Sequence, residues 1–104
     1  MPHLIIESSV NLTSGVVEAL HQVVGQQETV SIEAVKTRVY SPTVSFAGPS
    51  TEGSPQVAMT LKLLAGRDPK LKDKMASNLL RKAKELIPQS SITVEILDLG
   101  AYKK

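Results

Sequence analysis

Pro2 is the residue whose chemistry stands out first. Methionine before proline is normally removed after synthesis, because the second residue is small enough for the aminopeptidase, and removal would leave Pro2 with a free secondary amine. A neutral amine can take a proton from carbon, and burial and nearby positive charge both lower an amine's pKa towards neutral pH. Pro2 is therefore a candidate general base, although proline at this position is common and weak as a motif on its own.

Three cations are candidates to act with Pro2, namely Lys36, Arg38 and Arg67. Positive charges beside an amine favour its neutral form. They also bind a carboxylate and stabilise the enolate that forms when a carbon acid loses a proton. Taken singly, Lys36 and Arg38 fit a solvated strand face, and Arg67 fits a loop residue paired with Asp68 or a backbone carbonyl. Whether they meet Pro2 depends on the elements that carry them.

The first half of the chain has the pattern of a strand, a helix and a second strand. Residues 3–7 are a short, largely apolar run, and a helix with apolar residues at helical spacing follows, capped by Asn11 or Thr13 and ending near Gly25. Residues 34–41 alternate as a strand. One face of this strand carries Val35, Thr37 and Val39, and the other carries Lys36, Arg38 and Tyr40.

The second half repeats this order after a loop rich in Gly, Pro and Ser at residues 45–55. Residues 57–64 alternate as a strand. Asp68-Pro69 predicts a helix start, with an aspartate cap and proline at the first helical position. Pro88 ends this helix, whose apolar stripe consists of Leu71, Met75, Leu79, Ala83, Leu86 and Ile87. A last strand alternates through Ile92, Val94 and Ile96.

These elements predict an α+β fold, with two β-α-β units at about residues 1–46 and 55–104 in one domain spanning 1–104. We expect a four-stranded mixed sheet with both helices on one face. The first two strands are parallel, so their starts bring Lys36 and Arg38 towards Pro2. If the halves are antiparallel to each other, the end of the third strand brings Arg67 there too. The other sheet face lacks cover, so self-association is expected.

The bulk properties exclude several classes of function. The net charge is only +2, and no basic run is interleaved with aromatic residues, so nucleic-acid binding is not expected. The chain has no cysteine, and neither His3 nor His21 has a second ligand at metal spacing, so both histidines fit packing or surface roles. No apolar run approaches the roughly 18 residues that span a bilayer, and no signal peptide is apparent. We expect a cytoplasmic protein that does not bind membranes.

The sequence resembles the 5-carboxymethyl-2-hydroxymuconate isomerases of the tautomerase superfamily over most of its length. The similarity lies in MPHLIIE at residues 1–7, in residues 8–12, in KTRV at 36–39, in MTLK at 59–62, in AGR at 65–67 running into the second helix, and in VEI at 94–96. The first of these segments and the MTLK…AGR segment are the most specific.

The resemblance implies a trimer of duplicated β-α-β subunits. It also implies an enzyme of aromatic compound catabolism that moves a proton between carbon positions of an unsaturated 2-hydroxy or 2-oxo carboxylate. By position, Pro2 would be the general base, and Arg67 with the basic pair Lys36 and Arg38 would bind the carboxylate of a small metabolite. No metal or organic cofactor is implied.

The chain departs from the family pattern in three respects. Lys36 stands where the family typically has arginine, and lysine lacks the fork that binds a carboxylate with two bonds. Gln56-Val57-Ala58 stands where the family tends to have Phe-Val-His, and the central loop and the C-terminal tail are shorter. These differences bear on the substrate more than on the fold.

Two other interpretations stay open. A non-catalytic trimeric binding or structural protein would keep the fold, and retention of Met1 would favour it, because Pro2 would then be an amide instead of an amine. A small basic interaction module would use the lysines of the second helix, and its binding to polyanions would collapse with moderate salt. Those lysines are most simply a solvated helix face.

Overall fold

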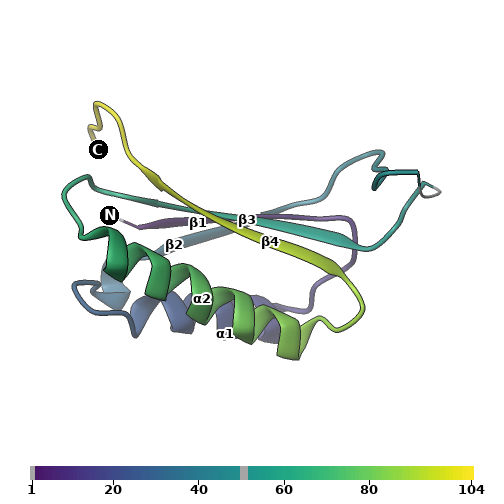
Figure 1. The fold of residues 1–104 in the computed structure, drawn as a ribbon, viewed down its shortest axis with the longest axis horizontal. Helices are drawn as coiled ribbons and strands as arrows, with labels where there is room; N and C mark the ends of the chain where they lie inside the picture. The colour runs from purple at the N-terminus through teal and green to yellow at the C-terminus, as the bar shows by residue number, and fades with distance from the viewer. Residues whose placement is uncertain (1, 50–51) are drawn as a thin grey trace.

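A computed structural model describes residues 2–49 and 52–104. Along the chain it contains β1 (His3–Ser8), α1 (Ser14–Gly25), the short 3-10 helix η1 (Ile32–Ala34), β2 (Lys36–Tyr40), β3 (Gln56–Leu63), α2 (Pro69–Leu86) and β4 (Ser91–Asp98). The predicted succession of two β-α-β units is confirmed (Figure 1). The prediction about Met1 lies outside the described residues.

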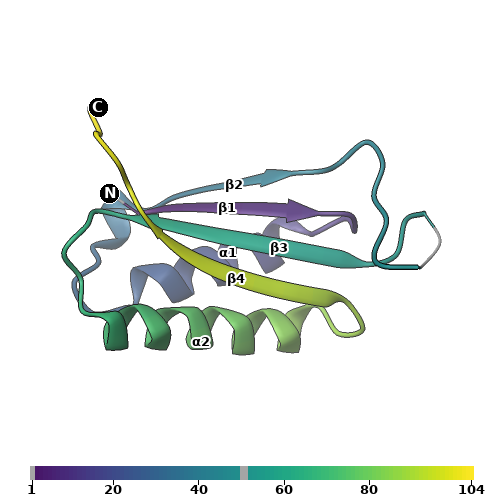
Figure 2. The same cartoon turned by 45° about the horizontal axis from the view of Figure 1, so that its top comes forward.

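The four strands form one mixed sheet in the order β2-β1-β3-β4. β1 is parallel to β2, β3 is parallel to β4, and the two halves meet where β1 pairs antiparallel with β3. Both helices lie against the same face, as expected (Figure 1). The two ends of the chain lie at the end of the sheet where β1 begins (Figures 1 and 2).

The core lies between the sheet and the helices and is aliphatic. Every second residue of β1 and β3 is buried on this side, as the alternation of a strand requires. The helices contribute the apolar residues of their inner faces. The core residues with 0% of their surface exposed are Leu4, Ile6, Leu20, Val24, Leu61, Leu63, Met75 and Ala83. The intervening strand residues lie on the face that the helices leave open.

Side chains cap both helices at their N-termini. Thr13 Oγ1 accepts a hydrogen bond from the Val16 amide at 3.2 Å, so Thr13 is the cap of α1. Asp68 Oδ1 accepts from the Lys70 amide at 2.9 Å, and Pro69 takes the first helical position as predicted. No helix in the described ranges is long and apolar enough to cross a membrane.

The predicted strand over residues 34–41 was too long. Ala34 belongs to η1, where its amide bonds to the Ser31 carbonyl at 3.0 Å and the Val35 amide bonds to the Ile32 carbonyl at 3.1 Å. Because these amides are used within the turn, the ladder to β1 begins only at Lys36. The faces were predicted correctly, since Val35 is buried and Thr37 bonds to α1.

Gly25, the last residue of α1, packs directly against Ile32. An added Cβ would overlap the Ile32 side chain, with Ile32 Cβ and Cγ1 both 3.0 Å away. We expect Gly25→Ala to lower the free energy of unfolding by about 1–3 kcal/mol, as overpacking usually does. Urea denaturation measures this. Gly15→Ala in the same helix is the control, because its nearest neighbour is Thr13 Oγ1 at 3.9 Å. Equal losses for both variants would contradict the steric explanation.

Candidate active site

Pro2 lies at the end of the sheet where β1 and β2 begin together. It is buried, and it continues the alternation of the buried residues Leu4 and Ile6. Its carbonyl accepts a hydrogen bond from the Lys36 amide at 3.0 Å. The parallel pairing of the first two strands therefore starts at Pro2. The backbone of Lys36, the first of the predicted cations, is bonded directly to the backbone of Pro2.

His3 is the residue after Pro2, and its side chain lies on the open face of the sheet. Its partner in register on β2 is Lys36, and its partner on β3 is Lys62. Residues opposite each other on neighbouring strands share a face and lie close together. A row of three basic side chains, with the histidine in the middle, therefore crosses the sheet one residue away from Pro2.

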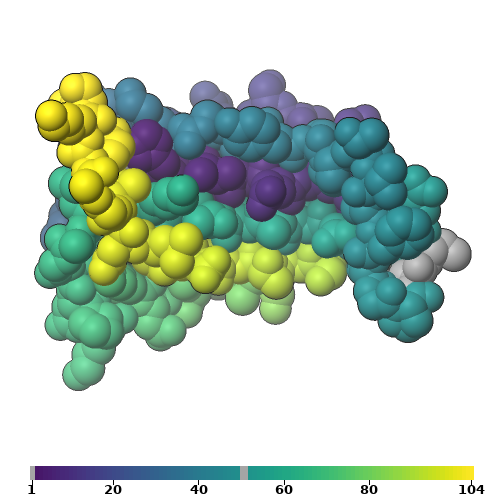
Figure 3. Space-filling model, turned by 90° about the horizontal axis from the view of Figure 1, so that it is seen from above, coloured from purple at the N-terminus to yellow at the C-terminus, as the bar shows by residue number. Residues whose placement is uncertain are grey.

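Arg38 reaches back along the open face to His3. Its Nη1 lies 3.2 Å from His3 Nδ1, and because a guanidinium group has only donors, Nδ1 must accept. The ring is therefore neutral with its proton on Nε2, which donates to the Tyr102 hydroxyl at 3.1 Å. The His3 and Tyr102 rings also meet edge to face, with centroids 5.7 Å apart. The C-terminal tail thus crosses this end of the open face (Figure 3).

The surroundings of His3 favour its neutral form. Burial lowers the pKa of His3 below its ordinary value of 6.5, and the positive charges of Arg38, Lys36 and Lys62 lower it further. In the unfolded chain the pKa returns to the ordinary value, so the unfolded state binds more protons. Stability from neutral His3 is therefore present above pH 6.5 and is lost as the pH falls through the lower, folded-state pKa.

We expect a proton NMR titration to place the pKa of His3 below 6.5 and to show it rising in Arg38→Gln. The substitution removes a neighbouring positive charge and the donor that requires Nδ1 to stay unprotonated. Lys84→Gln is the control, because Lys84 is an exposed cation on α2. A His3 pKa unmoved by Arg38→Gln, or moved equally by both changes, would contradict the assigned contact.

Arg67 lies beyond the end of β3, at the same end of the sheet, but its side chain is bound elsewhere. Its Nε donates to Thr29 Oγ1 at 3.0 Å, Nη2 to the Thr29 carbonyl at 3.3 Å, and Nη1 to the Leu64 carbonyl at 3.2 Å. Within residues 2–49 and 52–104, no hydrogen bond or ion pair joins Arg67 to Pro2. Lys36 and Arg38 thus lie beside His3 on the open face, and Pro2 precedes His3 in phase with the buried residues. Arg67 makes the loop contact that was the alternative expectation.

Comparison with known protein families shows which family the chain belongs to. The family described as 5-carboxymethyl-2-hydroxymuconate isomerase matches residues 2–97. The chain belongs to this family. The resemblance seen in the sequence segments is therefore confirmed. A search of curated proteins gives no significant match.

Several solved structures share this fold. A 5-carboxymethyl-2-hydroxymuconate isomerase from Deinococcus radiodurans R1 has a TM-score of 0.81 at 21% identity, covering 99% of this chain and 88% of that one. A 5-carboxymethyl-2-hydroxymuconate delta-isomerase gives 0.75 at 14%, covering 100% and 87%. The fused 4-OT protein Q0, a symmetric trimer, gives 0.77 at 19%, covering 93% and 85%.

Three residues that lie at the candidate site were not among the residues proposed for it from the sequence. His3 was expected to have a packing or surface role, and in the structure it joins Arg38 to Tyr102. Lys62 shared the open-face phase of β3, but its place beside His3 depends on the register between β1 and β3. Tyr102 lies in the tail after β4, where no periodic pattern predicts a direction.

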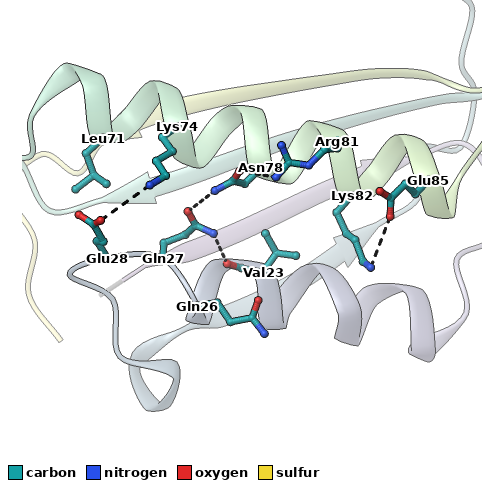
Figure 4. A pocket seen from close by; sticks show the side chains of 10 residues that line it. All are labelled: Val23, Gln26, Gln27, Glu28, Leu71, Lys74, Asn78, Arg81, Lys82 and Glu85. Atoms are coloured by element: carbon teal, nitrogen blue, oxygen red, sulfur yellow. Dashed lines mark hydrogen bonds and ion pairs between the residues drawn. The ribbon is translucent and has the colours of Figure 1, made fainter.

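A separate hollow of about 420 Å³ lies between α1 and α2, away from Pro2 (Figure 4). Several of its polar side chains bind one another. Asn78 donates to Gln27 Oε1 at 2.9 Å and accepts from Arg81 Nη2 at 2.7 Å. Lys74 pairs with Glu28 at 4.0 Å. Because these polar groups of the groove are paired with one another, the end of the sheet around Pro2 is the better candidate for chemistry.

Proposed function

We propose that the chain is a cofactor-independent tautomerase that moves a proton in an unsaturated 2-hydroxy or 2-oxo carboxylate, with the amine of Pro2 as general base once Met1 is removed. Membership of the isomerase family supports the reaction class. The observation that carries the residue assignment is the position of Pro2, buried and bonded through its carbonyl to Lys36, with the His3 and Arg38 pair beside it.

The chemistry follows from this arrangement. With a 2-oxo substrate, the neutral amine takes a proton from carbon, so a C–H bond breaks, an N–H bond forms and the electron pair moves onto the 2-oxo oxygen as an enolate. With a 2-hydroxy substrate, the amine takes the hydroxyl proton instead, so an O–H bond breaks and the same enolate forms. Arg38 and Lys36 hold the carboxylate and stabilise the enolate charge. The protonated amine then returns its proton to another carbon of the conjugated system. The product is an isomer, so no other reactant is consumed.

An ultraviolet assay tests the reaction class. With 2-hydroxymuconate-type and phenylpyruvate-type enols, we expect loss of the conjugated enol absorbance to be faster with protein than without it. The absence of turnover on every enol would support the alternative of a binding or structural protein with the same fold.

The same proposal includes a homotrimer. The sheet is covered by helices on one side only (Figure 1). The open face and its surroundings expose large apolar side chains, including Leu97, Tyr40 and Phe46. A sheet with no covering layer on its second face favours association with other copies of the chain. Sedimentation at micromolar concentration should show particles of three chains, and a pure monomer would contradict the assembly.

A further inference from the structure

We infer that His3 and Tyr102 are positioning residues that hold the Arg38 guanidinium group in place for a substrate carboxylate. The inference rests on the proposed function and deepens it, because both residues act on the same site through Arg38. It concerns side chains that need not touch the substrate themselves.

The Arg38 side chain is conformationally free unless another group holds it. It lies on β2, a strand at the edge of the sheet whose only neighbour in the described residues is β1. A long side chain on an edge strand has many rotamers, and ordering it on binding costs affinity. The hydrogen bond from Nη1 to His3 Nδ1 fixes one corner of the guanidinium group before a ligand arrives. This bond uses one of five N–H donors, so the planar group keeps donors for a carboxylate.

His3 is itself held in place by its backbone and by its ring. Its backbone is fixed in the parallel ladder, one residue after Pro2. Its ring is held on the other side by the Tyr102 hydroxyl and by the edge-to-face contact with the Tyr102 ring. The tail therefore fixes the orientation of the ring, while the donor-only guanidinium group of Arg38 sets the tautomer, with Nδ1 as acceptor and Nε2 as donor to Tyr102. The chain of contacts runs from Tyr102 through His3 to Arg38.

The surroundings of Tyr102, His3 and Arg38 are positively charged. Lys36 and Arg38 on β2 and Lys62 on β3 all face His3, and the tail contributes the Tyr102 hydroxyl. The salt bridges in the described ranges lie elsewhere, at Lys72–Asp98, Lys74–Glu28 and Lys82–Glu85. Three cations grouped without a carboxylate partner in the described chain favour an anionic ligand. An uncharged histidine among them can orient Arg38 without adding a fourth charge.

The test uses cis,cis-muconate, a dicarboxylate that lacks the 2-oxo or 2-hydroxy group needed for turnover. Calorimetry gives its Kd. We expect His3→Phe, which keeps a ring but removes both nitrogens, to weaken binding about tenfold, as loss of a hydrogen bond to a charged group does. His3→Asn, whose Oδ1 takes the place of Nδ1, should recover most of that loss. Tyr102→Phe should weaken binding about threefold, because Arg38 keeps its acceptor but the ring loses a support.

Kinetics with a phenylpyruvate-type enol add a second readout. In His3→Phe the KM should rise about tenfold while kcat changes much less, because the base is untouched. Circular dichroism checks that each variant is folded. If His3→Phe does not fold, the Kd values of His3→Asn and Tyr102→Phe test the inference instead. No binding of muconate by the unaltered protein, or equal Kd values in all variants, would overturn the inference. An equal loss in His3→Asn and His3→Phe would also overturn it.

Failure of the proposed function gives a different pattern. Pro2→Ala should lose most of its turnover and still bind muconate, because Arg38 and His3 remain. If Pro2→Ala keeps its turnover, the base assignment fails, and the muconate comparison still decides whether His3 and Tyr102 position Arg38.

Discussion

Pro2→Ala should lower kcat at least about a hundredfold on any enol that the unaltered protein isomerises, because a positioned general base contributes about 10²–10⁴ to the rate. Alanine at position 2 still permits removal of Met1, so the variant keeps a terminal amine. That amine is primary, and it lacks the ring that buries Pro2 at the start of β1. A smaller residual rate is therefore expected instead of none.

The ultraviolet enol assay measures this loss under matched conditions. Pro42→Ala is the control, because Pro42 is an exposed proline in the loop after β2. A second variant with an extra residue between Met1 and Pro2 converts the amine into an amide and should lose the activity that remains in Pro2→Ala. Equal kcat values for Pro2→Ala and the unaltered protein would reject the proline mechanism.

Arg38→Lys should reduce kcat/KM about 10- to 100-fold. Lysine keeps the positive charge but loses the planar group that binds a carboxylate with two parallel hydrogen bonds, and hydrogen bonds to charged groups contribute about 1.5–3 kcal/mol each. The loss should appear mainly as a higher KM. Arg38 differs in this respect from Lys36, which already lacks the fork and is exposed.

Steady-state kinetics on the same enol give the comparison. Arg81→Lys is the matched control, since Arg81 is an exposed arginine on α2, and its nearest polar contact is Asn78 Oδ1 at 2.7 Å. Its kcat/KM should stay within about twofold of the unaltered protein, as expected for a surface change remote from the site. No loss in Arg38→Lys, or the same loss in both variants, would contradict a carboxylate role for Arg38.

The sequence predicted the fold well because its signals were local. Alternation along β3 assigned Val57 and Leu61 to the core, and the Asp68-Pro69 pair marked the start of α2. Each depends on residues close in the chain, which periodicity and capping chemistry describe directly. The 3-10 helix at residues 32–34 was not predicted. It spans only three residues, and its hydrogen bonds compete with those of the predicted strand.

The candidate site was predicted only in part because its contacts are long-range. Lys36 and Arg38 followed from the shared starting edge of parallel strands. The bond between His3 and Tyr102 joins residues 99 positions apart, and no pattern in the tail predicts where it folds back. Arg67 was placed at the correct end of the sheet, but its bonds to Thr29 and the Leu64 carbonyl depend on loop geometry.

If Pro2 acts as an amine, active protein purified from its native source must lack Met1, and its intact mass shows whether it does. We expect a mass without Met1 and an N-terminal peptide that begins at Pro2. Full turnover in a sample whose mass retains Met1 would contradict this assignment, because Pro2 would then be an amide that cannot accept a proton from carbon.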